Sequence, residues 1–148
     1  DDRPPAGTIT VADLSTGSDI PALAAATNRA EGFRGGFRRV WERGADGAQL
    51  QVEVDSFTCA DGAALFVNQN GIPEPDVKPF RVTDGISGAL GFMSTTRNAR
   101  GHYRQAIFAR VGDAAILVSY FSPSPSTATL QSLAAAAAGH LAAVTAGS

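Results

Sequence analysis

The sequence contains one cysteine and two histidines in 148 residues. Cys59 alone can form no internal disulfide and no cysteine-based metal cluster. His102 and His140 lack the spacing of helical metal ligands, and the carboxylates are scattered, so we expect no metal site and no cofactor. A G-x-S-x-G nucleophile elbow and a P-loop lysine are also missing. These absences exclude the common motif-based serine hydrolases and nucleotide-phosphate sites.

Basic excess and long apolar runs are missing as well. Lys78 is the only lysine, the net charge is −2 and the pI is about 5.6. A nucleic-acid-binding domain would usually carry a strong basic excess. No apolar run reaches the roughly 20 residues of a transmembrane helix. With 44% hydrophobic and 18% charged residues, the chain has the composition of a globular domain.

The length predicts a single domain. Residues 1–8, with Pro4 and Pro5, have the composition of a tether, and we expect one α+β domain over residues 9–148. The chain begins with Asp1 instead of methionine. A tether of this kind commonly follows a removed export signal, so we expect a secreted or cell-surface protein, anchored to a membrane only through its N-terminus if at all.

A tight hairpin is predicted around Gly112-Asp113, where a glycine in the first position favours a type II′ turn. Its strands are Tyr103–Val111 and Ala114–Phe121, and the turn pairs Val111 with Ala114. The following prolines end the second strand. A long helix then begins after Ser124, or alternatively after Ser126, and Gly147 is a plausible end. Its apolar residues recur at helical spacing: Leu130, Leu133, Ala134, Ala137, Leu141 and Val144.

A second hairpin is predicted around Asp46-Gly47, a strong type I′ signal. A two-residue turn pairs Trp41 with Val52 and Arg39 with Val54. It also pairs Arg38 with Asp55 as an exposed cross-strand charge pair. A short helix over residues 60–68, capped by Ser56 or Thr58, follows this hairpin. The two hairpin–helix units indicate either an internal duplication or two copies of a common supersecondary motif.

The remaining elements complete an α+β fold. We expect a short strand within Thr8–Leu14, a helix over Pro21–Ala30 with Ile20, Leu23, Ala24 and Thr27 on one side, and an edge strand at Phe80–Thr83. A strand over residues 86–93 would join the hairpin at residues 103–121 in a meander. The sequence therefore predicts an antiparallel sheet of about five to seven strands with helices packed on one face.

Two segments carry a family resemblance. They are RRVWERGADGAQLQVEVDSFTCADGAALF (Arg38–Phe66) and FARVGDAAILVSYFSPSP, from Phe108 onward with its Ala/Leu helix. The pattern resembles secreted proteins and lipoproteins of actinobacteria, some of which have a PsbP-like α/β/α sandwich. The resemblance implies an exported, non-enzymatic protein of the cell envelope. It assigns no functional residue, and the start of the chain has no lipobox cysteine.

Cysteine chemistry is one candidate activity. Cys59 could pair with His102 or His140, because a base must lower the pKa of a thiol to make it a nucleophile. Cys59 follows an apolar strand, however, and nothing in the sequence brings a histidine to it. We therefore expect a buried structural thiol, and keep a small enzyme around Cys59 and His102 as an alternative.

Arginines provide the main candidate binding site. They gather in two stretches, residues 29–43 and 97–110, which would adjoin if the two hairpins share a sheet. Guanidinium groups bind carboxylates and phosphates through paired donors. We expect an anionic ligand or an acidic protein partner at this face, with an ordinary solvated surface and a structural subunit of an envelope complex as alternatives. The candidate ligand-binding residues are Arg39, Arg43, Arg97, Arg100, Arg104 and Tyr103.

Overall fold

The computed structural model describes residues 7–16, 18–43, 46–70, 75–83 and 85–146. In chain order the elements are β1 (Gly7–Ile9), α1 (Val11–Ser15), α2 (Pro21–Ala30), β2 (Phe33–Glu42), β3 (Gln49–Phe57), α3 (Ala60–Asn70), β4 (Val77–Phe80), β5 (Leu90–Ser94), β6 (Tyr103–Val111), β7 (Ala114–Ser122) and α4 (Thr127–Ala146). None of the helices in these ranges is long and apolar enough to cross a membrane.

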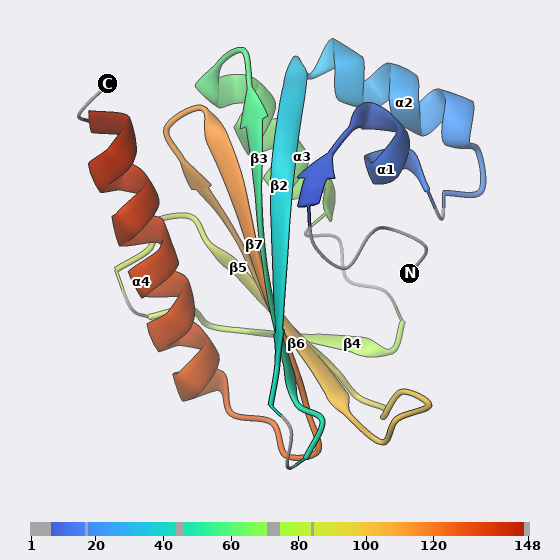
Figure 1. Ribbon diagram of the computed structural model, residues 1–148, viewed down its shortest axis with the longest axis vertical. Coiled ribbons are helices and arrows are strands. Elements are labelled where there is room, and N and C mark those ends of the chain that lie inside the picture. Colours follow the sequence, from blue (N-terminus) through green and yellow to red (C-terminus); the bar gives the residue numbers. More distant parts are fainter. Residues whose placement is uncertain (1–6, 17, 44–45, 71–74, 84, 147–148) are drawn as a thin grey trace.

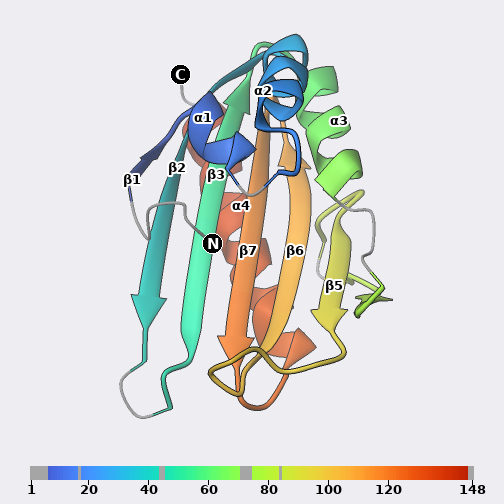
Figure 2. The same ribbon diagram turned by 90° about the vertical axis from the view of Figure 1, so that its right-hand side faces the viewer.

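The strands form one seven-stranded antiparallel sheet in the order β1-β2-β3-β7-β6-β5-β4. Figures 1 and 2 show α1, α2 and α3 on one face of this sheet and α4 on the other. The predicted α+β class is confirmed, and so is the β5-β6-β7 meander. The expectation that all helices pack on one face is wrong, because the central strands β6 and β7 are apolar on both sides.

Each face of the sheet has its own core. On the α3 side, Phe57, Phe66, Phe108 and Leu117 are buried together. On the α4 side the buried cluster contains Ile107, Ala109, Ile116, Val118, Leu130 and Ala134. Side chains alternate between the faces of a strand, so neighbouring residues of β6 and β7 supply opposite cores. The sheet is therefore the middle layer of a three-layer molecule.

The predicted hairpin at residues 103–121 is confirmed in its register. Val111 pairs with Ala114 and Ile107 with Val118. Gly112 has φ 61°, whereas the φ of Asp113 is not positive, which is the combination that a type II′ turn requires. The helix after it begins at Thr127, and the Ser126 hydroxyl accepts from the Thr129 amide at 3.4 Å. Of the two predicted caps, Ser126 is therefore correct; Gly147 lies outside the described residues.

The register predicted for the β2–β3 hairpin is wrong by two residues. Trp41 pairs with Leu50, Arg39 with Val52 and Arg38 with Glu53. The Arg43 amide donates to the Ala48 carbonyl at 2.8 Å, so Asp46-Gly47 lies inside a longer loop and not in a two-residue turn. The shift is even, and each side chain therefore keeps its predicted face.

The charged pair predicted at the surface of this hairpin is in fact buried. Arg38 is 2% exposed and Glu53 1% exposed, and their side chains approach to 2.6 Å on the α3 side of the sheet. Asp55, the predicted partner of Arg38, is buried on the same side and packs over Gly36. A polar alternation along β3 is thus an internal charge cluster and not a solvated face.

The N-terminal part differs from its prediction in a local way. The predicted strand within Thr8–Leu14 is replaced by β1 and the short helix α1, because Thr10 and Asp13 form a capping box. Residues 1–6 of the predicted tether lie outside the described residues, and Gly7 and Thr8 belong to β1. Helix α2 has the predicted bounds, and α3 extends to Asn70. The edge strand β4 shares only Phe80 with the predicted strand Phe80–Thr83, and β5 begins at Leu90, four residues after its predicted start.

Both predicted hairpin–helix units are present, but their helices lie on opposite faces of the sheet (Figure 2). A two-fold rotation about an axis perpendicular to the sheet would place β2–β3 on β6–β7. It would leave α3 and α4 on opposite faces of the sheet. The two units therefore differ in handedness and are not superposable as whole repeats. This arrangement favours the common-motif interpretation over a simple duplication.

Candidate functional site

The candidate residues gather at the end of the sheet where the β2–β3 and β5–β6 loops lie, at the bottom of Figures 1 and 2. We call this the basic end and define it by Arg39, Arg43, Arg97, Arg100 and Arg104. Arg43 and Arg97 lie in or next to these loops, and Arg39 lies near the end of β2. The structure thus brings the two arginine stretches together at one end of the molecule.

The β2–β3 loop is shaped by the Asp46 carboxylate. It forms a two-pronged ion pair with Arg43, whose Nε donates to Asp46 Oδ1 at 3.1 Å, and it accepts the Ala48 amide at 3.1 Å. These hydrogen bonds lower the pKa of Asp46 to about 2, with Arg43 the largest cause. The carboxylate therefore stays ionised over the whole physiological range and fixes the guanidinium of Arg43.

The β5–β6 loop is shaped by the Asn98 side chain. Its Oδ1 accepts the backbone amides of Arg100 at 2.9 Å and His102 at 3.0 Å. The backbone N–H of Asn98 donates to the His102 carbonyl at 2.8 Å, and Gly101 adopts φ 77° to close the turn. The Asn98 side chain thus satisfies two backbone amides of the loop that have no strand partner.

Two contacts connect these loops across the end of the sheet. The buried ring of His102 has Nε2 3.1 Å from the carbonyl oxygen of Asp46, at hydrogen-bonding distance. Arg100 Nη1 lies 3.9 Å from the Glu42 carboxylate, with both side chains exposed. The loops are 56 residues apart in sequence at the His102–Asp46 contact. They therefore present their arginines in a defined relation and not as independent tips.

Two of the arginines stack on aromatic rings. The guanidinium carbon of Arg39 lies 5.2 Å from the ring centre of Trp41, and that of Arg97 lies 5.1 Å from the ring of Tyr103. Trp41 is 44% exposed. Stacking holds a guanidinium without occupying its N–H donors, so the edges of the group remain available to an anion.

The basic end covers parts of both faces of the sheet. The alternation along β2 and β6 puts Arg39 and Tyr103 on the α4 side and Arg104 on the α3 side. Not every arginine of the two stretches belongs here. Arg38 is buried with Glu53, and Arg34 and Arg110 lie near the opposite ends of β2 and β6.

The cysteine candidates are far apart. Cys59 is exposed just before α3, so the expectation of a buried thiol is wrong. His102 lies at the other end of the sheet, roughly 30 Å away along the nine residues of β3. His140 is on α4, across the sheet from Cys59. Among the described residues, no group of three or more His, Cys, Asp or Glu side chains could hold a metal ion.

The sequence alone could not identify the residues that connect the loops. Asn98 and His102 stand in a polar segment without a motif, and the Asp46 carbonyl is a backbone group that any residue supplies. In this segment only Asn98 and Gly101 are typical of a turn, and a turn does not predict a contact with the other loop. Trp41 was placed on the correct face, but its exposure depends on how far α4 extends across the sheet.

No family model and no curated protein matches the sequence of this chain. Among solved structures, the fold is similar to that of the extracellular domain of PknH from Mycobacterium tuberculosis. The TM-score is 0.56 at 12% sequence identity, and the match covers 94% of this chain and 80% of that domain. The similarity concerns the fold. It tests neither the resemblance to secreted actinobacterial proteins nor the PsbP-like part of that expectation.

Proposed function

We propose that this chain is an exported, non-enzymatic binding module that captures an anionic partner at its basic end. The observation that carries the proposal is the pair of stacked guanidiniums, Arg39 on Trp41 and Arg97 on Tyr103. They lie beside two loops that His102 and Asp46 connect. An exported location is supported by the similar fold of an extracellular domain. The separation of Cys59 from both histidines favours binding over chemistry.

The ligand class follows from the donors. Arginine edges recognise oxyanions through paired N–H groups, so phosphate, sulfate or clustered carboxylates suit this surface. The carboxylates in contact with the basic end, Glu42 and Asp46, are engaged with Arg100 and Arg43. Among the described residues, no carboxylate forms an ion pair with Arg39 or Arg97, which gives a local positive potential on a chain of net charge −2.

Heparin provides a defined polyanion for the test. We expect the protein to be retained on immobilised heparin at low salt despite its net negative charge. The triple variant Arg39→Ser, Arg97→Ser, Arg100→Ser should elute at clearly lower salt, because each lost phosphate- or sulfate-type contact reduces the salt dependence of binding. A titration with a soluble heparin oligosaccharide, followed by the fluorescence of Trp41, measures the same loss in solution.

A matched control variant distinguishes binding at the basic end from a general effect of the protein's net charge. Arg29, Arg34 and Arg110 are exposed and lie away from the basic end, so their triple serine variant loses the same charge. It should elute with the wild-type protein. Equal losses in both triple variants, or no retention of the wild type, would contradict the proposal.

A further inference from the structure

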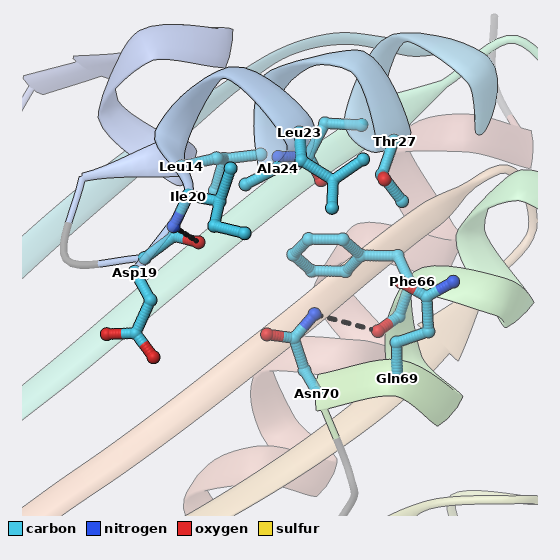
Figure 3. Close-up of a pocket in the computed structure, with 11 residues that line it drawn as sticks. Leu14, Asp19, Ile20, Leu23, Ala24, Thr27, Phe66, Gln69 and Asn70 are labelled. Carbon is cyan, nitrogen blue, oxygen red and sulfur yellow. Dashed lines mark hydrogen bonds between the residues drawn. The ribbon is translucent and has the colours of Figure 1, made fainter.

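A groove lies between α2 and α3, at the end of the molecule opposite the basic end (Figure 1). This groove has a volume of about 540 Å³. That size is within the range of small-molecule sites, roughly 300–1,000 Å³. Figure 3 shows the ring of Phe66 in the middle of the groove, with Leu23 above it and Asn70 below.

The apolar part of the groove is exposed to an unusual extent. Ile20 is 59% exposed and Leu23 is 60% exposed, although both line the groove. They belong to the side of α2 that the sequence pattern marked as apolar. In the described structure this side faces the groove instead of completing a core, and so α2 presents large hydrophobic side chains that a bound hydrocarbon would cover.

The polar part of the groove is acidic and rich in amides. Asp19 stands at one end in Figure 3, and it is the one ionisable side chain among the described residues that line the groove. Gln69 and Asn70 lie along α3, and the Asn70 side chain donates to the Phe66 carbonyl at 2.9 Å, which orients its own oxygen outward. The described lining thus offers acceptors and a negative charge, and no arginine or lysine is among its described residues.

A buried carboxyl adds an independent observation. Glu31, just after α2, is 7% exposed, and neither of its side-chain oxygens has a hydrogen-bond partner. The amide of Gln69, which lines the groove, approaches this carboxyl without completing a well-formed hydrogen bond. A buried acceptor without a donor is costly. Glu31 does not itself line the groove; it is an acidic neighbour of the lining residue Gln69.

We propose that the α2–α3 groove binds a cationic amphiphile, an alkyl chain that carries a protonated amine. The alkyl chain covers Ile20 and Leu23 and contacts the exposed edge of the largely buried Phe66 ring. The ammonium donates to the Asp19 carboxylate and to the amide oxygens of α3. The lining contains no positively charged group to pair with a carboxylate or phosphate, so a fatty acid of equal length is a poorer ligand. The site is separate from the basic end and has the opposite charge preference.

Three probes of equal chain length test the charge preference: decylamine, decanol and decanoate, each below its micellar concentration. Backbone amide shifts of uniformly ¹⁵N-labelled protein report binding at α2 and α3. We expect saturable shifts at residues 19–28 and 66–70, with affinity decreasing from the amine to the alcohol to the carboxylate. Decanoate binding as tightly as decylamine, or no saturable shifts with any probe, would overturn the proposal.

Two variants and a control place the ligand. Asp19→Asn should weaken decylamine about two- to fivefold, the size of an exposed ion pair, and leave decanol unchanged. Leu23→Ser should weaken both, since it removes apolar contact surface. Leu65→Ser is the matched control, because Leu65 is 52% exposed on α3 but does not line the groove. Equal effects of Leu65→Ser and Leu23→Ser would show non-specific adsorption and refute the assignment.

Discussion

The carboxyl of Glu31 is a residue-scale feature with a measurable consequence for stability. Burial raises its pKa above the ordinary value, and Gln69 offsets part of the rise. Between the unfolded and the folded pKa, the unfolded chain releases its proton first. The free energy of unfolding therefore falls as the pH rises through this window, and the full penalty is present above the folded pKa.

Replacing this carboxyl with an amide removes the penalty. Glu31→Gln should be more stable than the wild type at pH 7, and the difference should shrink below about pH 4, where the unfolded carboxyl is protonated as well. Urea denaturation at both pH values measures it. Glu42→Gln, at an exposed site, is the control. Identical stability of wild type and Glu31→Gln at both pH values would show that the carboxyl finds a compensating partner.

Two residue-scale predictions were wrong because burial could not be read from neighbouring residues. Alternation along β3 correctly put Glu53 and Asp55 on one face with Arg38, but polarity was taken to mean exposure. Charged residues are almost never buried unless they are paired. The pairing that allows this burial depends on a register shift of two residues, which side-chain alternation cannot detect. The prediction of a buried Cys59 was wrong in the opposite sense. Cys59 follows an apolar strand, but it lies at the exposed start of α3.

At the scale of elements, replacing either of two helical glycines with alanine is expected to change stability in opposite directions. A Cβ at Gly62, in the first turn of α3, would lie 1.9 Å from the Glu31 carbonyl oxygen. A Cβ at Gly139 in α4 would have no atom within 4 Å. Alanine is favoured over glycine in a helix by about 1 kcal/mol. Gly62 is thus retained for the close approach of α2 to α3, whereas Gly139 serves no contact.

Gly139→Ala should therefore raise the free energy of unfolding by about 0.5–1 kcal/mol. Gly62→Ala should lower it by about 1–3 kcal/mol, because overpacking against a backbone oxygen exceeds the gain in helix propensity. Thermal unfolding of the two variants beside the wild type gives both signs in one experiment. A stabilising Gly62→Ala would mean that α2 moves away from α3 at little cost, and the groove between them would then be adaptable.

The elements themselves were largely predictable, because their signals are local. The turn at Gly112-Asp113 follows from the positive φ of its glycine, the start of α2 from Pro21 in its first turn, and the long apolar helix α4 from helical spacing. The two-residue turn predicted at Asp46-Gly47 is wrong because the Asp46 side chain accepts hydrogen bonds from Arg43 and Ala48. These bonds stabilise a longer loop than a type I′ turn. The distribution of helices over both faces is a non-local property that no segment encodes by itself.

The whole molecule has two ends of opposite character on one rigid sheet. The basic end offers exposed guanidiniums, whereas the α2–α3 groove offers apolar and acidic groups. Strand β3 alone separates them by roughly 30 Å over its nine residues. The structure gives the described elements a single arrangement, and coupling between the sites would require an element with two arrangements that both sites bias.

The two sites should therefore bind independently, and the single tryptophan allows the test. Trp41 lies under Arg39 at the basic end, so its fluorescence should respond to a heparin oligosaccharide and not to decylamine. Saturating decylamine should change the heparin affinity less than about twofold, since the reciprocal coupling free energy is close to zero. Salt should weaken the heparin interaction steeply and the amine interaction much less, because apolar contact contributes to the latter. A mutual change in affinity of about fivefold or more would contradict a rigid sheet and would mean that the loops at one end and the helices at the other move together.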